Sequence, residues 1–264
     1  GIYKNWIKEE NIIKTNVWSS ELSKLTSNAF LAQRLSSINT ISAICEKTGA
    51  NIDEVAQAIG LDERIGKNFL KSGPGFGGSC FKKDILNLIY ISKFYGLHEV
   101  SEYWSQVLKI NNWQKRRISH LIVNKLLSNL KNKKIAILGF AFKANTNDTR
   151  ESSAIEICQD LLEEGAIIHI YDPKVSFAQI SKDLSKNNYE NNIFHAKSIE
   201  MAIQDSDSVV ILTEWEEFRE IDWNKLSKIM RKPAWIFDCR DIINERFMDN
   251  VNINFWKCGY KGRF

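Results

Sequence analysis

The chain of 264 residues is long enough for one large domain or two ordinary ones, and its composition is typical of a folded globular protein. Its net charge is only +4, with basic and acidic residues interspersed, which argues against a nucleic-acid-binding surface. The apolar runs are far shorter than the ~18 residues of a membrane span. The first residues carry no apolar signal segment, so we expect a cytoplasmic protein without membrane contact.

The first half of the chain predicts helices, taken here in chain order. Residues 19–45 contain neither Gly nor Pro and place apolar residues at helical spacing, and residues 53–59 predict a short helix. Residues 81–95 follow a glycine-rich segment and again show helical spacing. From about residue 100 to residue 130 the pattern predicts one long amphipathic helix, either a spine between two domains or an oligomer surface.

The second half predicts strands that alternate with helices, starting after the basic residues 131–134. The expected strands are residues 135–140, 167–172, 209–213 and 234–238, and the expected helices are residues 152–164 and 198–204. This alternation predicts a parallel sheet of the α/β class. We therefore expect a helical segment at residues 1–130 and a Rossmann-like domain at residues 131–264.

Five cysteines are widely spaced, without any C-x-x-C pair, which argues against a disulfide framework and against a zinc or other metal site. Cys45, Cys158, Cys239 and Cys258 lie in apolar surroundings and are expected to be small core residues. Cys80 directly follows a run of glycines and needs a separate explanation.

Residues 71–84 contain a formal G-x-G-x-x-G pattern at Gly73, Gly75 and Gly78. A dinucleotide fingerprint needs a strand before it, and no strand pattern precedes this segment. We interpret the segment as a flexible loop whose backbone N–H groups approach an anion or a polar ring closely.

Cys80 falls at the expected start of the helix at residues 81–95, where the helix dipole, Lys82 and Lys83 favour the thiolate. Asp84 lies one turn further along the same face. A nucleophile with a carboxylate one turn away is suited to covalent catalysis. The alternative is a buried cysteine in a glycine-rich turn, with Asp84 as an ordinary first-turn charge.

Two further groups of polar residues are candidates for a binding site. Lys24 and Asn28 are neighbours on one helix face and either project into a pocket or are simply solvated. The segment 139–144 follows the first expected strand but has one Gly instead of three, so we expect this domain to bind something other than NAD. There Phe142 is suited to stack on a base or ribose, and three cations are suited to meet phosphate. These cations are Lys143, Arg150 and Arg240.

Five segments together resemble the UDP-glucose 6-dehydrogenases, in the same order along the chain. Residues 18–34 resemble the central-helix signature of that family, and residues 75–84 resemble its catalytic loop. Residues 139–153, 171–173 and 237–240 resemble parts of its UDP-binding domain. The similarity covers nearly the whole chain.

The resemblance implies a four-electron oxidation of UDP-glucose to UDP-glucuronate with two NAD. Cys80 would form a thiohemiacetal and then a thioester, Lys24 would stabilise the oxyanion, and Asn28 and Asp84 would position water and the reacting oxygen. Arg150 and Cys80 would contact NAD. The implied substrate-binding residues are Arg64 (reaching into a neighbouring subunit), Phe69, Lys71, Gly73, Gly75, Phe76, Gly77, Phe142, Lys143 and Arg240.

The family also has an N-terminal NAD-binding domain, which we expect to be missing here, so the chain alone should bind a UDP-sugar without turnover. We expect a homo-oligomer, at least a dimer. Asp241 departs from the family, because many members carry another basic or polar residue after Arg240. Two alternatives remain open: a dehydrogenase of another sugar nucleotide, such as UDP-N-acetylmannosamine or GDP-mannose, and a stand-alone UDP-binding module.

Overall fold

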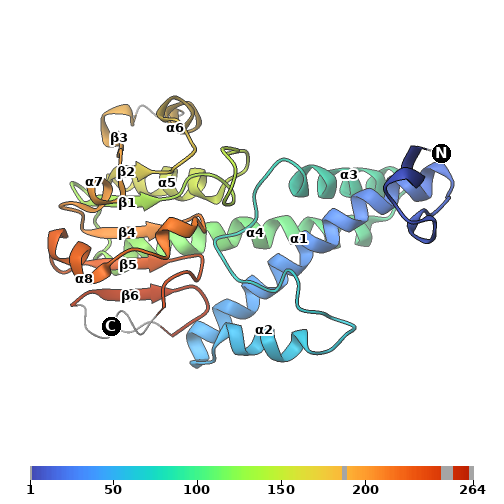
Figure 1. Cartoon of the computed structure of the whole chain (residues 1–264), viewed down its shortest axis with the longest axis horizontal. Helices are drawn as coiled ribbons and strands as arrows, with labels where there is room; N and C mark the ends of the chain where they lie inside the picture. The colour runs from blue at the N-terminus through green and yellow to red at the C-terminus, as the bar shows by residue number, and fades with distance from the viewer. Residues whose placement is uncertain (1, 186–188, 245–251, 262–264) are drawn as a thin grey trace.

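The structure is a computed structural model that describes residues 2–185, 189–244 and 252–261, and it has a helical part and a sheet part (Figure 1). The helical part consists of α1 (Val17–Thr48), α2 (Ile52–Gly60), α3 (Phe81–Phe94) and α4 (His98–Lys125). The sheet part consists of β1 (Lys134–Leu138), α5 (Ser153–Glu163), β2 (Ile167–Tyr171), α6 (Phe177–Leu184), β3 (Ile193–His195), α7 (Ile199–Ile203), β4 (Ser208–Ile211), α8 (Trp223–Leu226), β5 (Trp235–Asp238) and β6 (Asn254–Lys257).

Helix α1 is long because its ends are capped and its interior contains no helix breaker. The Asn16 side chain accepts a hydrogen bond from the Ser19 N–H at 2.8 Å and starts the helix. Gly49 ends it in the left-handed conformation that favours glycine, at φ 85°. The residues that α1 buries are mostly small, such as Ala29, Ala32 and Ser36, so α3 and α4 pack closely against it.

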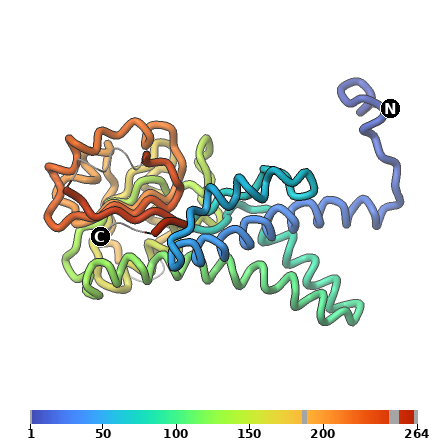
Figure 2. Tube along the Cα trace, turned by 90° about the horizontal axis from the view of Figure 1, so that it is seen from below, coloured from blue at the N-terminus to red at the C-terminus, as the bar shows by residue number. Residues whose placement is uncertain are grey.

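Helix α4 connects the two parts of the molecule. Its N-terminal half packs against α1 and α3, whereas Ile118 and Ile122 near its C-terminal end belong to the core of the sheet part. Figure 2 shows the helices extending away from the sheet, with the first residues of the chain at the far end. No helix among the described residues has both the length and the apolar character that crossing a membrane requires.

The sheet has six strands in the order β3-β2-β1-β4-β5-β6, and every neighbouring pair is parallel. The order reverses between β1 and β4, and in open α/β sheets ligands bind beside this point, outside the carboxyl ends of the strands. The central strands are buried on both faces, which explains why their sequences are runs of apolar residues. The α/β class and the Rossmann-like parallel sheet expected from the sequence are confirmed.

Two details differ from the sequence prediction. Helix α4 ends at Lys125 instead of about residue 130, because Leu127 and Ser128 have positive φ and form a turn. The pattern also missed α6, β3 and α8, which are short, and β6. Strand β6 lies in the closing segment, where Trp256 pairs in register with Phe237 of β5 and extends the sheet at its edge.

Candidate functional site

Asp84 in the first turns of α3 holds two side chains of α1. Its Oδ2 atom accepts hydrogen bonds from Lys24 Nζ at 3.2 Å and from Asn28 Nδ2 at 2.5 Å. Asp84 is buried, whereas the Lys24 side chain remains 67% exposed. The packing of α1 on α3 thus brings together three candidate residues that are far apart in the sequence, and the carboxylate fixes the position of a cation that still faces outward.

Cys80 is the residue immediately before α3, and its thiol is exposed. The other four cysteines are buried, as the sequence predicted. The Ser79 hydroxyl lies 3.7 Å from the Cys80 sulfur. A thiol placed at the N-terminus of a 14-residue helix meets the positive end of the helix dipole. The structure therefore offers one accessible nucleophile among the five thiols of the chain.

Two basic residues near Cys80, one in the sequence and one in the fold, are paired with carboxylates. Lys82 pairs with Glu151 at 2.8 Å. The pKa of the Arg150 guanidinium is raised, chiefly by its hydrogen bond to Asp148 and in smaller part by the nearby Cys80. Arg150 comes next to the start of α3 because its carbonyl accepts a hydrogen bond from the Gly78 N–H at 2.8 Å.

The glycine-rich loop before Cys80 is pressed against the sheet part. A Cβ atom on Gly77 would stand 2.5 Å from the Glu151 carbonyl oxygen, so only glycine allows this approach. Gly75 and Gly78 have φ values of 108° and 83°, in the region that favours glycine. The loop therefore requires glycine for two separate reasons, close contact and backbone conformation.

Three buried amide side chains from the helices hold the same loop, and the sequence analysis missed all three. Asn39 Oδ1 accepts the Gly73 N–H at 2.9 Å, and Gln114 Nε2 donates to the Gly73 carbonyl at 2.8 Å. Asn111 accepts from the N–H of Phe76 at 2.8 Å and donates to its carbonyl at 3.1 Å. The sequence did contain a signal for these contacts, namely amide residues on the buried faces of α1 and α4. A buried amide needs hydrogen-bond partners, so such residues point to a segment that they hold in place.

A cavity of about 360 Å³ lies between this loop and the carboxyl ends of the strands. Its lining combines aromatic rings, glycines and a few charged groups, which is typical of a small-molecule site. The lining residues are Leu35, Asn39, Phe69, Lys71, Ser72, Gly73, Gly75, Phe76, Gly77, Phe81, Phe142, Lys143, Glu214 and Arg240. They include nine of the ten substrate-binding candidates; Arg64 is the exception.

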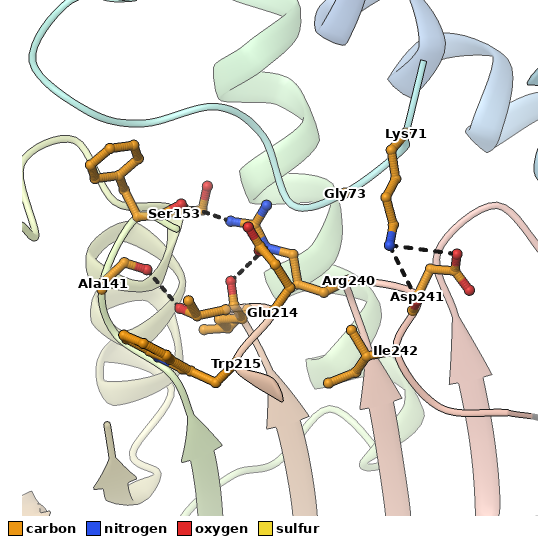
Figure 3. A network of polar contacts seen from close by, with 12 residues as sticks. Lys71, Gly73, Ala141, Ser153, Glu214, Trp215, Arg240, Asp241 and Ile242 are labelled. Atoms are coloured by element: carbon orange, nitrogen blue, oxygen red, sulfur yellow. Dashed lines mark hydrogen bonds and ion pairs between the residues drawn. The ribbon is translucent and has the colours of Figure 1, made fainter. Parts of the chain in front are cut away.

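Arg240 is fixed in the cavity wall by groups from the two segments that follow β1 and β4 (Figure 3). Its Nε donates to the Leu212 carbonyl at 2.7 Å and lies 3.2 Å from Glu214 Oε2, and its Nη2 donates to the Phe142 carbonyl at 3.1 Å. The Lys143 ammonium lies 5.4 Å from the centre of the Phe142 ring. The cavity therefore presents cations that other side chains already orient.

Arg64 and Phe69 both belong to the segment between α2 and α3, but only Phe69 reaches the cavity. The Arg64 side chain is 88% exposed and pairs with Asp62 at 2.6 Å. Arg34 of α1 supports the segment by donating to the carbonyls of Ile65 and Gly66. Arg64 thus projects into solvent on this chain, away from the cavity.

The backbone after β1 does not fit a dinucleotide pyrophosphate. The N–H groups of Phe140 and Ala141 both donate to Asp172 Oδ2, at 2.7 and 3.0 Å, so they are already satisfied. Gly139 serves packing, because a Cβ there would lie 2.4 Å from the Thr213 Cβ. Among the described residues, no three His, Cys, Asp or Glu side chains are grouped as metal ligands.

Comparison with known proteins gives one family for both parts of the chain. Residues 18–113 match the central domain of the UDP-glucose/GDP-mannose dehydrogenase family, and residues 136–245 match its UDP-binding domain. UDP-glucose 6-dehydrogenase of Drosophila melanogaster is 51% identical over 98% of this chain, which covers 56% of that relative. The chain therefore spans about half the length of the curated relatives it matches.

Two solved structures share the fold over the same region. A UDP-glucose dehydrogenase from Pyrobaculum islandicum gives a TM-score of 0.76 at 28% identity, over 92% of this chain and 51% of that one. UDP-D-ManNAc dehydrogenase from Pyrococcus horikoshii gives a TM-score of 0.80 at 25% identity, over 98% of this chain and 56% of that one. Both family matches and the likeness to these enzymes lead to one conclusion: the chain belongs to the UDP-glucose/GDP-mannose dehydrogenase family.

Proposed function

We propose that this chain is the substrate-holding part of a UDP-glucose 6-dehydrogenase, with residues 1–130 as the central segment and residues 131–264 as the UDP-binding domain. The observation that carries the proposal is that residues on both sides of the exposed thiol in the sequence line the cavity. Phe76, Gly77 and Phe81 line the cavity, and Cys80 lies between them in the sequence. A nucleotide in the cavity would thus place its attached sugar next to a nucleophile.

The division of roles follows from the charges and rings. Arg240, Lys143 and Lys71 are the cations for the diphosphate, since phosphate recognition favours such groups. Phe142 offers an aromatic face on which a base or ribose can stack. The backbone of the loop from Gly73 to Gly77 approaches the ligand closely because it carries no side chain at three positions.

The chemistry assigned to the thiol site uses groups whose geometry is given above. The Cys80 sulfur adds to the C6 aldehyde carbon and forms a thiohemiacetal, and Lys24 stabilises the negative oxygen that develops. After oxidation, water attacks the resulting thioester, releases the carboxylate and returns the thiol; Asp84 and Asn28 position that water. In the family reaction NAD accepts the hydrides.

Calorimetry with UDP and UDP-glucose tests this function. The purified chain is expected to bind both, because Lys71, Lys143 and Arg240 all line the cavity within this one chain. Addition of NAD is expected to produce no NADH, because the N–H groups after β1 are already bonded to Asp172. A flat UDP titration, or steady NADH production, would contradict the proposal.

The likeness to UDP-D-ManNAc dehydrogenase favours a second candidate, a dehydrogenase of another sugar nucleotide. A UDP-N-acetylmannosamine dehydrogenase differs from the first candidate only in the sugar that lies against Cys80, whereas a GDP-mannose dehydrogenase also differs in the base of the nucleotide. Parallel titrations with UDP-glucose, UDP-N-acetylmannosamine and GDP-mannose separate them. We expect UDP-glucose to bind most tightly. Tighter binding of either other ligand would favour the second candidate over a UDP-glucose dehydrogenase.

We further propose that α4 forms a two-fold dimer interface. The helix exposes Val100, Tyr103 and Trp113, which are large apolar side chains that its own part of the molecule leaves uncovered. Light scattering at tens of micromolar is expected to show a dimer. The variant Trp113→Glu should shift the equilibrium toward monomer, because it places a charge in the apolar contact. Monomer alone for the unmodified chain would contradict this interface.

A further inference from the structure

The loop after β5 places two opposite charges side by side, and buried Asp238 fixes its shape. Asp238 accepts hydrogen bonds from the N–H groups of Arg240 at 3.0 Å, Ile242 at 2.9 Å and Ile243 at 2.8 Å. Asp241 adopts φ 53°, a conformation that Asp tolerates better than most residues. As a result, Arg240 is directed toward Glu214, while Asp241 lies on the other side of the turn, beside Lys71 (Figure 3).

Asp241 is shared between two lysines with different surroundings. Its Oδ1 atom pairs with Lys257 of β6, whose side chain is only 9% exposed. Its Oδ2 atom lies 3.8 Å from Lys71 Nζ, which also donates to the Asp241 carbonyl at 3.3 Å. A buried lysine requires a counter-ion, so the Lys257 pair supports the fold. The Lys71 side chain is 52% exposed and lines the cavity, so its pair with Asp241 lies at the ligand site.

The contact between Lys71 and Asp241 is weak enough to exchange. Its carboxylate distance is long, and half-exposed ion pairs contribute little stability because water screens them. A nucleotide diphosphate in the cavity is a stronger acceptor for an ammonium group than a carboxylate at 3.8 Å. Binding of the diphosphate therefore requires Lys71 to leave Asp241, and the lost contact subtracts from the affinity.

We propose that Asp241 is an affinity-determining residue that competes with the bound nucleotide diphosphate for Lys71. This inference rests on the proposed function of the cavity. Asp241 acts through Lys71 and is thus a positioning residue. Removing its carboxylate should free Lys71 and tighten binding, although most substitutions beside a ligand weaken it.

A double-mutant cycle tests the competition, with UDP as the probe and calorimetry as the measurement on the full chain. We expect Asp241→Asn to tighten UDP binding about three- to fivefold, the scale of a partly exposed ion pair. Lys71→Met should weaken binding, and Asp241→Asn should have no effect when added to Lys71→Met. An equal gain in both backgrounds would show a general effect of charge and overturn the proposal, as would a loss or no change with Asp241→Asn.

A second measurement needs no ligand and keeps the test independent of the proposed function. Acetic anhydride labels free amines, so Lys71 should be acetylated faster in Asp241→Asn than in the unmodified chain, while Lys143 in the same cavity keeps its rate. Unfolding would accelerate both lysines together. An unchanged Lys71 rate would overturn the proposed contact.

The stability of Asp241→Asn is checked by its melting temperature, because the change also weakens the pair with buried Lys257. If this variant fails to fold, Asp241→Asn is combined with Lys257→Met, which removes both charges of that pair. The combined variant then replaces Asp241→Asn in the double-mutant cycle. Faster Lys71 labelling together with a flat UDP titration for the unmodified chain would reject the proposed function and, with it, the role of Asp241 in nucleotide affinity. Normal UDP binding with an unchanged Lys71 rate would reject this inference alone.

Discussion

The nucleotide cavity and the thiol site are neighbours, but they are built differently. The cavity is enclosed by residues of both parts of the chain, and its cations Lys71 and Arg240 already have carboxylate partners. The thiol site consists of residues of α1 and the start of α3, and both Lys24 and Cys80 are exposed. The comparison indicates that nucleotide recognition depends on contacts across the whole fold, whereas the reactive group depends on one helix terminus.

The largest expected effect is a difference in thiol reactivity, which sharpens the contrast between the open site and the buried core. With iodoacetamide at pH 8 we expect Cys80 to react more than about a thousandfold faster than the other four cysteines, because these react only after local opening. Burial raises the pKa of Cys258 to about 11, so its thiolate, the reactive form, should be populated only as the pH rises toward 11. Mass spectrometry of each site over pH 5 to 11 measures both effects.

UDP-glucose is the control for the same labelling experiment. If the sugar lies against the sulfur, added UDP-glucose should slow the reaction of Cys80 alone. Cys80 reacting no faster than Cys258, or protection appearing at another cysteine, would reject the assignment of the nucleophile.

The second prediction tests the close contact between the glycine-rich loop and the sheet part. Gly77→Ala is expected to destabilise the chain by about 1–3 kcal/mol, because its Cβ would stand 2.5 Å from the Glu151 oxygen. Gly73→Ala is the matched control in the same loop, since its Cβ would meet nothing closer than the Cys239 carbonyl oxygen at 3.5 Å. Urea unfolding followed by circular dichroism measures the difference, and equal stability of the two variants would argue against the contact.

A third prediction separates the cations of the two regions by their influence on nucleotide affinity. Arg240→Ala should weaken UDP binding about 10- to 100-fold, the scale of a lost charged hydrogen bond. Lys82→Ala should leave UDP affinity within about twofold, because exposed ion pairs such as that with Glu151 contribute little. Calorimetry measures UDP binding by both variants. A similar loss of UDP affinity in both would show that the two regions do not differ in their influence on the nucleotide.

The elements of the fold were largely predictable, because their signals lie within a few neighbouring residues. Helix α1 was expected at residues 19–45 and spans Val17–Thr48, and α3 was expected at residues 81–95 and spans Phe81–Phe94. Strand β6 was missed because only Phe255 and Trp256 of its four residues are apolar, whereas β4 and β5, which are equally short, carry three apolar residues each. An isolated short strand carries too little periodicity to be recognised without its neighbour.

The sequence by itself determined the α/β class, the place of Cys80 at the start of a helix, and the glycines of the loop. Helical period, strand composition and capping depend on adjacent residues, and the chain carries them directly. Only the tertiary structure decided the partners: Lys82 with Glu151, Arg240 with Glu214, and Lys71 with Asp241. The last of these pairs joins residues 170 positions apart, and a charge in the sequence does not specify which opposite charge the folded chain brings beside it.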